Sequence, residues 1–267
     1  MKQYWSFFKL RFAAGLQYRA AALAGMLTQL FFGLVFISVY IAFYSNGEGN
    51  ASINLQEITT YLWLNQMLYS LIFVWYKDPE LQKLISNGNI AYELCRPQNI
   101  YIMWFTRILS AKLSSVLLRS IPLLIIILFL PAPYAMSAPV SLYAFIMFVI
   151  SLIISSLLVT ALIVLVYVIS CYTIDEKGIV NIYYSIAEIL SGQIVPLPLF
   201  PKLLGIVASF LPFAYVSDFA FRIYCGNIMG MDIIKGLLIQ ISWLFIIFIL
   251  GQIITNKILK RVVVQGG

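Results

Sequence analysis

The chemistry open to this chain is narrow, because side chains that often carry catalysis or bind metals are scarce. The sequence has no histidine, and its three cysteines, Cys95, Cys171 and Cys225, are widely separated. Cysteines at this spacing form neither a metal-binding motif nor a disulfide framework. The phosphate-binding pattern G-x-x-x-x-G-K-[ST] and the motifs of serine hydrolases and zinc proteases do not occur. We therefore expect no catalytic residue, metal or cofactor in this chain.

One carboxylate, Glu188, falls inside a stretch that we expect to cross a membrane. A charge at that depth is costly, so the group should be protonated, paired or facing a cavity. Ser185, Ser191 and Gly192 lie on nearly the same helical face, at spacings of three and four. Glu188 therefore lines a transport pathway or makes a hydrogen bond between helices, and the sequence favours neither interpretation.

Two amides, Asn65 and Gln66, occupy the centre of another apolar stretch. Small polar residues inside membrane helices are most often packing contacts between helices, although some line a substrate pathway. The same two interpretations apply to Ser151 and Ser155, which share one helical face. We take Asn65 and Gln66 as candidate pathway residues beside Glu188.

The composition indicates that these residues are positioned by helices in a lipid bilayer. The 267 residues are 62% hydrophobic and only 10% charged, with a mean hydropathy of +0.96. A soluble domain carries about 25% charged residues, so this chain must have membrane lipid as its main solvent. Backbone polar groups in lipid need internal partners, which leaves helices or closed barrels. The apolar runs are long and continuous, which favours an all-α integral membrane protein.

Six transmembrane helices are predicted from these runs, in one transmembrane domain that covers 1–267. Their expected ranges are 20–44, 58–76, 108–130, 140–171, 179–195 and 233–255. We expect a protein of the cell membrane that crosses it several times.

Two further segments are apolar but do not read as full spans. Residues 1–19 alternate cations with aromatic residues, which predicts an interfacial helix or, alternatively, a basic flank of the first span. The stretch 196–232 is apolar but holds four prolines. It predicts two short helices that separate near 211–213 and enter the membrane from outside without crossing it. The alternative is a loop on the surface.

The basic residues predict the orientation. Fourteen of the 17 Lys and Arg residues fall in the N-terminal segment, in 77–119, at Lys177 or at the C-terminus. The remaining three are Lys202, Arg222 and Lys235. Because cytoplasmic segments carry an excess of Lys and Arg, both termini should be cytoplasmic. This distribution also explains the net charge of +7 without nucleic-acid binding.

The polar stretch 77–107 is the largest feature of the predicted cytoplasmic face. Within it, Ile85 to Arg96 can form a short amphipathic helix that ends at Pro97. Its internal apolar residues, among them Ile90 and Leu94, favour docking of a soluble partner over a merely solvated loop.

The arrangement resembles the membrane subunit of type-two ABC exporters. The similar segments are the basic-aromatic N-terminus, the stretch ISNGNIAYELCRPQNIY and the stretch SGQIVPLPLFPKLLGIVASFLPFAYVSDFAFRIYCGN. The resemblance covers the whole chain in architecture, through loose motifs. It implies an interfacial helix, six spans, a cytoplasmic coupling helix between spans two and three, and a re-entrant hairpin before span six.

The resemblance also implies partners. As a permease the chain would pair with a second permease subunit, in a homodimer or heterodimer, and with separate ABC ATPase subunits that bind the ATP. Ile90 and Leu94 would then insert into a cleft on the ATPase, with Glu93 and Arg96 pairing at its rim. A stand-alone channel or secondary carrier remains the alternative. The sequence shows neither a filter motif nor the internal repeat of many carriers.

Overall fold

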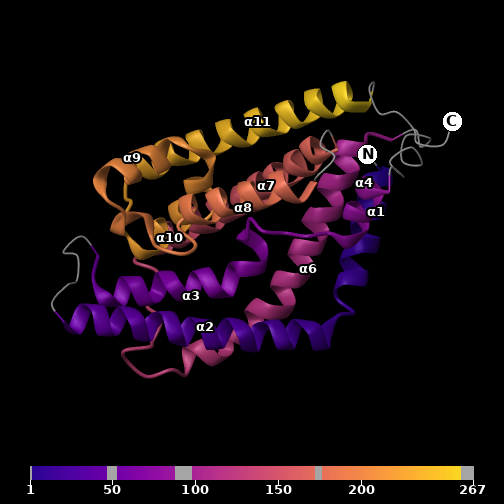
Figure 1. Cartoon of the computed structure of the whole chain (residues 1–267). Coiled ribbons are helices and arrows are strands. Elements are labelled where there is room, and N and C mark those ends of the chain that lie inside the picture. Colours follow the sequence, from indigo (N-terminus) through magenta and orange to yellow (C-terminus); the bar gives the residue numbers. More distant parts are fainter. Residues whose placement is uncertain (1, 47–52, 88–97, 172–175, 260–267) are drawn as a thin grey trace.

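The computed structural model describes residues 2–46, 53–87, 98–171 and 176–259, and these ranges are helical with no strand. Figure 1 shows the arrangement. The α-helices are α1 (Lys2–Gly15), α2 (Arg19–Ser45), α3 (Leu55–Ile72), α4 (Pro79–Ser86), α6 (Ile100–Leu128), α7 (Leu142–Ser170), α8 (Glu176–Leu190), α9 (Lys202–Phe210), α10 (Asp218–Cys225) and α11 (Met231–Leu259). Short 3-10 helices form η1 (Leu197–Leu199) and η2 (Pro212–Tyr215).

Four of these helices are long and apolar enough to cross a membrane: α2, α6, α7 and α11. They have 27 to 29 residues. At about 1.5 Å per residue such helices exceed the roughly 30 Å of a bilayer's hydrocarbon core. Together with the helical content, they confirm an all-α protein with several membrane-spanning helices.

The other two expected spans, 58–76 and 179–195, correspond to α3 and α8, which do not qualify as spans by length and composition. The central helical positions of α3 include Asn65 and Gln66, and most of its residues are buried by protein. A helix surrounded by protein can carry polar side chains that lipid would not tolerate. The 15 residues of α8 rise only about 22 Å. The count of six spans therefore stays a prediction.

The core of the molecule is centred on α7, which packs against α11, α6 and α10. Ser151 and Ser155 face α11, where the Gln240 amide joins them. Gln240 Nε2 donates to Ser155 Oγ at 2.9 Å and to the Tyr215 carbonyl of η2 at 2.8 Å. Ser151 Oγ donates to Gln240 Oε1 at 3.1 Å. These serines are therefore packing contacts that join α7, α11 and η2.

A second, smaller core lies between α2, α3 and α6. Trp63 of α3 is fully buried there and packs on Gly33 of α2. A Cβ atom at position 33 would lie 2.5 Å from the indole ring, so only glycine permits this close approach.

The C-terminal end of α3 is held by a buried cation. Lys112 of α6 is 1% exposed, and its Nζ donates to the carbonyls of Leu71 at 3.2 Å and Phe73 at 2.7 Å. These carbonyls lie at the end of the helix, where intrahelical donors run out and the dipole favours positive charge. Lys112 therefore stabilises the end of α3 and is not a loop charge.

The helix expected over 108–130 begins earlier, at Ile100. The side chain of Asn99 accepts a hydrogen bond from Ile102 N at 3.1 Å and caps the helix. Asparagine is a strong N-cap, so the helix extends back to this residue although 100–107 is less apolar. Arg107 consequently lies inside α6 and not in the loop where the sequence placed it.

The stretch 196–232 forms short helices. Of these, α9 and α10 have 9 and 8 residues and are separated by η2, which begins at Pro212. Helices of this length cannot cross a bilayer. Their depth in the membrane stays a prediction, as does the interfacial position of α1, which is a separate helix turned away from α2 (Figure 1).

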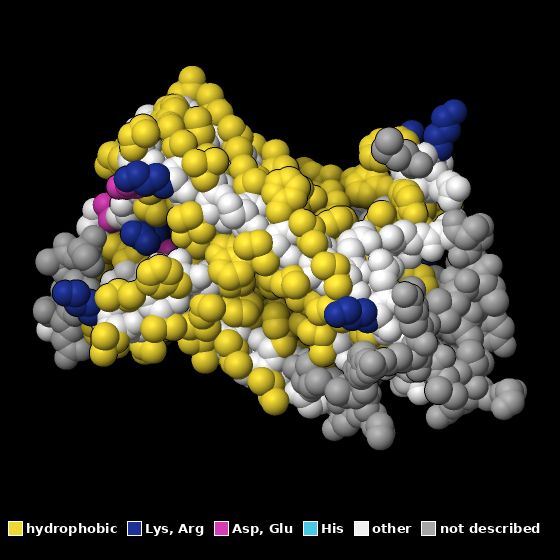
Figure 2. Space-filling model, turned by 90° about the horizontal axis from the view of Figure 1, so that it is seen from above, with side chains coloured by type: hydrophobic (Ala, Val, Ile, Leu, Met, Phe, Trp, Pro, Cys, Tyr) yellow, Lys and Arg dark blue, Asp and Glu magenta, His cyan; other side chains and the backbone are white. Residues whose placement is uncertain are grey.

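Hydrophobic side chains cover most of the molecular face in Figure 2, and basic side chains lie toward the two ends of the molecule. The exposed hydrophobic residues come mainly from α2, α6, α7, α9 and α11. A surface of this kind suits lipid contact.

Candidate functional site

The candidate site is a polar network where the chain leaves α3 and enters α4. Asp78 precedes the helix, and its Oδ1 accepts hydrogen bonds from the backbone N–H groups of Glu80 at 3.0 Å and Leu81 at 3.1 Å. Pro79 follows at the first helical position. Aspartate at the N-cap and proline at N1 are both favoured there, so the local sequence specifies where α4 begins.

Arg107 of α6 binds the same carboxylate with two hydrogen bonds. Its Nε lies 2.5 Å from Asp78 Oδ2, and its Nη2 lies 2.8 Å from Asp78 Oδ1. The two side chains are only 11% and 7% exposed. This bidentate geometry fixes the direction of both groups, and the burial makes loss of either partner costly.

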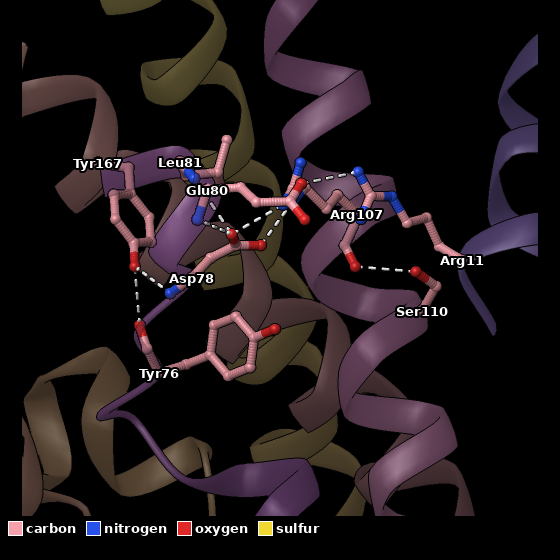
Figure 3. A network of polar contacts seen from close by, with 8 residues as sticks. All are labelled: Arg11, Tyr76, Asp78, Glu80, Leu81, Arg107, Ser110 and Tyr167. Atoms are coloured by element: carbon pink, nitrogen blue, oxygen red, sulfur yellow. Dashed lines mark hydrogen bonds and ion pairs between the residues drawn. The ribbon is translucent and has the colours of Figure 1, made fainter. Parts of the chain in front are cut away.

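Glu80 extends the network to the N-terminal helix, as Figure 3 shows. Its Oε2 accepts from Arg107 Nη2 at 2.5 Å and from Arg11 Nη2 of α1 at 3.1 Å. The hydrogen bonds from Arg11 and Arg107 lower the pKa of Glu80 below its ordinary value. The carboxylate therefore keeps its charge at neutral pH and joins α1 to α6 through α4.

Two tyrosines connect the network to the central helices. The backbone N–H of Asp78 donates to the Tyr167 hydroxyl of α7 at 2.8 Å, and that hydroxyl lies 3.1 Å from the Tyr76 carbonyl (Figure 3). The Tyr184 hydroxyl of α8 donates to the same carbonyl at 2.7 Å. The segment 76–80 is thus bonded to α1, α6, α7 and α8.

The charges of this network are matched, two guanidinium groups with two carboxylates, so the arrangement suits holding α4 in a fixed position. A cavity of about 490 Å³ borders it, lined by α1, α2, α6 and the start of α4. Among the described residues, no group of histidine, cysteine, aspartate and glutamate side chains could hold a metal ion.

The predicted pathway residues do not lie in this network. Asn65 is 2% exposed, and its Nδ2 donates to the Gln193 carbonyl at 2.7 Å. Gln66 is also buried, at 6% exposed. Glu188 of α8 is half-buried, and it has no side-chain hydrogen bond or ion pair to the described part of the chain. Their role in transport stays a prediction.

Asn65 belongs to a second polar cluster, which holds the break after α8. The Tyr61 hydroxyl lies 3.0 Å from both the Gly192 carbonyl and Asp218 Oδ1. Asp218 Oδ1 also accepts from the backbone N–H of Leu197 at 3.2 Å. Sequence reasoning missed Asp218, although a carboxylate in an apolar stretch, four residues before Arg222, was a signal.

The residues predicted to bind an ATPase, Ile90, Glu93, Leu94 and Arg96, lie outside the described residues. The polar stretch 77–107 begins at the Asp78 network. It leads into α6, which is capped by Asn99. That network was not predicted from the sequence, since it joins residues 11, 78, 80, 107 and 167.

The comparison with protein families decides the class of the protein. A family model described as ABC-2 family transporter protein matches residues 26–266. The chain belongs to this family. The match covers α6, α7 and α11 in full and α2 from residue 26 onward. No curated protein and no solved structure matches the chain.

Membership in the ABC-2 family confirms the resemblance seen in the sequence. It identifies a multi-pass membrane protein of an ABC transporter family, and it favours the permease interpretation over a stand-alone channel or secondary carrier. Members of the ABC-2 permease family are generally non-enzymatic membrane subunits that pair with an ABC ATPase.

Proposed function

We propose that this chain is the permease subunit of an ATP-driven ABC exporter. It would form half of the translocation pathway, pair with a second permease subunit and receive energy from a separate ATPase. The observation that carries the proposal, beyond the family, is the position of α4. This helix of eight residues is tied at its first turn to α1 and α6, and the segment before it is bonded to α7 and α8.

Such an anchorage suits a coupling element. Without a nucleotide-binding motif in the chain, energy must arrive by contact with the ATPase. The buried face of α4 carries Leu81, which is 1% exposed, while Lys83 and Ser86 are exposed. A displacement of α4 caused by the ATPase would be transmitted to α1, α6, α7 and α8. Ion pairs and hydrogen bonds of the segment 76–80 connect α4 to these helices.

The proposed topology has six crossings, with both termini and α4 on the cytoplasmic side. Two observations support it. Most of the described residues of the fourteen-residue basic group lie in α1, in or just before α4, or at the ends of α2, α8 and α11 that Figure 1 places on the side of the N- and C-termini. The others, Arg107, Lys112 and Arg119, lie within α6. The chain then alternates in direction through α2, α3, α6, α7, α8 and α11. The short helices α9 and α10 would form the external re-entrant hairpin.

The proposed pathway lies along α8, between this chain and a second permease subunit. The exposed residues of α8 include Ile182, Ile186 and Ile189, and Glu188 is half-buried beside them. An apolar helix face with one carboxylate at its edge suits a partner helix next to a polar route. Glu188 is thus the better pathway candidate, since Asn65 is already bonded inside the subunit.

The coupling surface is tested by changing the predicted anchors. We expect Ile90→Asp or Leu94→Asp to release the ATPase from the purified complex, because loss of a buried interface anchor commonly costs about 2 kcal/mol or more. Glu93→Ala should weaken binding less, since rim charges contribute less. The measurement is the amount of ATPase that co-purifies with the full-length permease from native membranes.

The matched control is Ala138→Asp, which adds the same charge at an exposed loop position between α6 and α7. Undiminished ATPase binding in Ile90→Asp and Leu94→Asp would place the coupling surface elsewhere, with residues 175–178 as the next candidate. If no ATPase co-purifies with the unchanged chain, the channel or carrier alternative gains support.

A further inference from the structure

The end of the molecule away from α4 holds a cavity that collects basic residues. This cavity of about 570 Å³ lies between α9, η2, α10 and the beginning of α11. Lys202, Arg222 and Lys235 all line it. They are the three basic residues that lie outside the basic group used to orient the chain.

Their convergence is a property of the fold. Lys202 is the first residue of α9, Arg222 lies in α10, and Lys235 is in the first turns of α11. Cations that only anchor helices at a membrane surface would point outward separately. Here three separate helices direct them to one hollow. Figure 2 shows basic side chains gathered beside hydrophobic ones at the end where α9 lies in Figure 1.

Two carboxylates, Asp218 and Asp232, also line the cavity, but they do not satisfy all the hydrogen-bond donors of the three cations. Asp218 is 2% exposed, and its Oδ1 is engaged by Tyr61 and Leu197. Arg222 Nη1 lies 3.6 Å from Asp218 Oδ2, and the Nε atom of Arg222 is buried without a hydrogen-bond partner. A buried donor left unpaired is unfavourable, so this guanidinium is suited to a further acceptor.

Lys235 has only a surface ion pair. It lies 3.1 Å from Asp232, and the two side chains are 69% and 73% exposed. Exposed pairs of this kind contribute little, so Lys235 can turn toward a stronger anion at low cost. Lys202 makes no ion pair or hydrogen bond through its side chain among the described residues, and it adds a second exposed ammonium group.

Part of the wall of the same cavity is apolar and continues onto the exposed hydrophobic surface. Ile206 of α9 and Ile239 of α11 line it and are 47% and 43% exposed. Beyond them α9 exposes Leu203 at 80% and Phe210 at 74%. A free phosphate would satisfy the cations and leave these walls unused, whereas a lipid would occupy both.

We propose that this cavity binds the headgroup of one anionic phospholipid from the leaflet on the side of α9. The phosphate would accept from Arg222, Lys202 and Lys235, and the acyl chains would lie against Ile206 and Ile239. A zwitterionic headgroup fits less well, because three cations and two carboxylates line the cavity, both carboxylates already face cations, and the lining keeps an excess positive charge. The lipid would join α9 and α10 to α11. The proposal does not depend on which side of the membrane is cytoplasmic.

Native mass spectrometry of the full-length protein in detergent tests this site, with phosphatidylglycerol and phosphatidylcholine as probes. We expect one phosphatidylglycerol per chain to be retained above the phosphatidylcholine level. Lys202→Gln and Lys235→Gln should each weaken retention about fivefold, as expected for one basic group at a lipid headgroup. Both positions are exposed on the surface, so the variants should fold.

The matched control is Lys257→Gln, an exposed lysine near the other end of α11. It should retain phosphatidylglycerol as the unchanged protein does. Equal loss in this control, unchanged retention in the Lys202→Gln/Lys235→Gln double variant, or equal retention of phosphatidylcholine would each overturn the proposal. Glycerol phosphate serves as a soluble competitor that lacks acyl chains. If it displaces phosphatidylglycerol at equal concentration, the site binds free phosphate and not a lipid.

Discussion

At the scale of single residues, Asp78 has several functions at once. Its carboxylate caps α4 and binds Arg107, while its backbone N–H donates to Tyr167. Each contact orders the same short segment, so their effects support one another. The side chain is only 7% exposed, so a lost contact is poorly compensated by bulk solvent.

The first prediction separates the ion pair from the cap. Asp78→Asn keeps a good N-cap but removes the charge that faces Arg107. We expect the free energy of unfolding to fall by about 3 kcal/mol, because the buried guanidinium of Arg107 loses its bidentate partner and keeps only the exposed carboxylate of Glu80. Thermal unfolding of the purified permease in detergent measures the change.

The matched control is Glu80→Gln, at a neighbouring carboxylate that is 63% exposed. It should lower the stability by less than about 1 kcal/mol, since exposed ion pairs contribute little. An equal loss in both variants would show that the buried pair has no special role. Restored stability in Asp78→Asn/Arg107→Leu would support the ion-pair explanation, because the buried guanidinium that lost its bidentate partner is then gone, while Glu80 keeps its contact with Arg11.

At the scale of elements, the break between α8 and η1 is held by a glycine in the left-handed conformation and by contacts from α3. Gly192 follows the end of α8 with φ 77°, a conformation that other residues rarely adopt. Its carbonyl accepts from Tyr61, and the next carbonyl accepts from Asn65. Gln193 Nε2 in turn donates to the Ile72 carbonyl at 3.0 Å. Helix α3 therefore fixes where α8 stops and where the short helices begin.

The second prediction concerns this break. Gly192→Ala should destabilise the protein by at least about 1 kcal/mol, because left-handed backbone is strained for a residue with a Cβ atom. The added Cβ would also lie 2.7 Å from the Tyr61 hydroxyl. Thermal unfolding in detergent is again the measurement.

Gly205→Ala is the matched control for that substitution. The glycine lies inside α9, and the nearest atom to an added Cβ is 4.0 Å away on Phe200. Alanine is favoured over glycine in a helix, so this variant should be neutral or slightly stabilising. A loss at position 205 as large as at 192 would argue against the special geometry of the break.

At the scale of the whole molecule, most charged groups lie toward the two ends of the long helices. The network of Asp78 and the cavity of Lys202 lie at different ends of the long helices, with an apolar surface between them (Figures 1 and 2). The basic excess near α1, α4 and the end of α11 is expected to remain on the cytoplasmic side, because moving cations across a bilayer is costly.

The third prediction tests this orientation. In a background without Cys95, Cys171 and Cys225, Ser86→Cys should react with a membrane-impermeant thiol reagent only from the cytoplasmic side. Ala138→Cys should react only from outside. Both positions are exposed in the structure, so lack of access would come from the membrane and not from burial in the protein. Labelling of both from the same side would contradict the topology.

The sequence by itself determined the membrane class, the four long apolar helices and the breaks at the prolines of 196–232. These features are local, since a continuous apolar run or a proline acts through its neighbours and through the solvent. The family resemblance was also readable, because it depends on the order of such segments. The boundary at 108 was misplaced because the cap at Asn99 outweighed the polarity of the next residues.

Only the tertiary structure decided which distant residues meet. Arg107 reaches Asp78 across 29 positions, and Tyr61 reaches Asp218 across 157. The sequence could not show that Asn65 meets the Gln193 carbonyl, and its predicted place in a pathway stays a prediction. The angle and register at which helices cross result from the packing of many side chains together, and no local pattern contains that information.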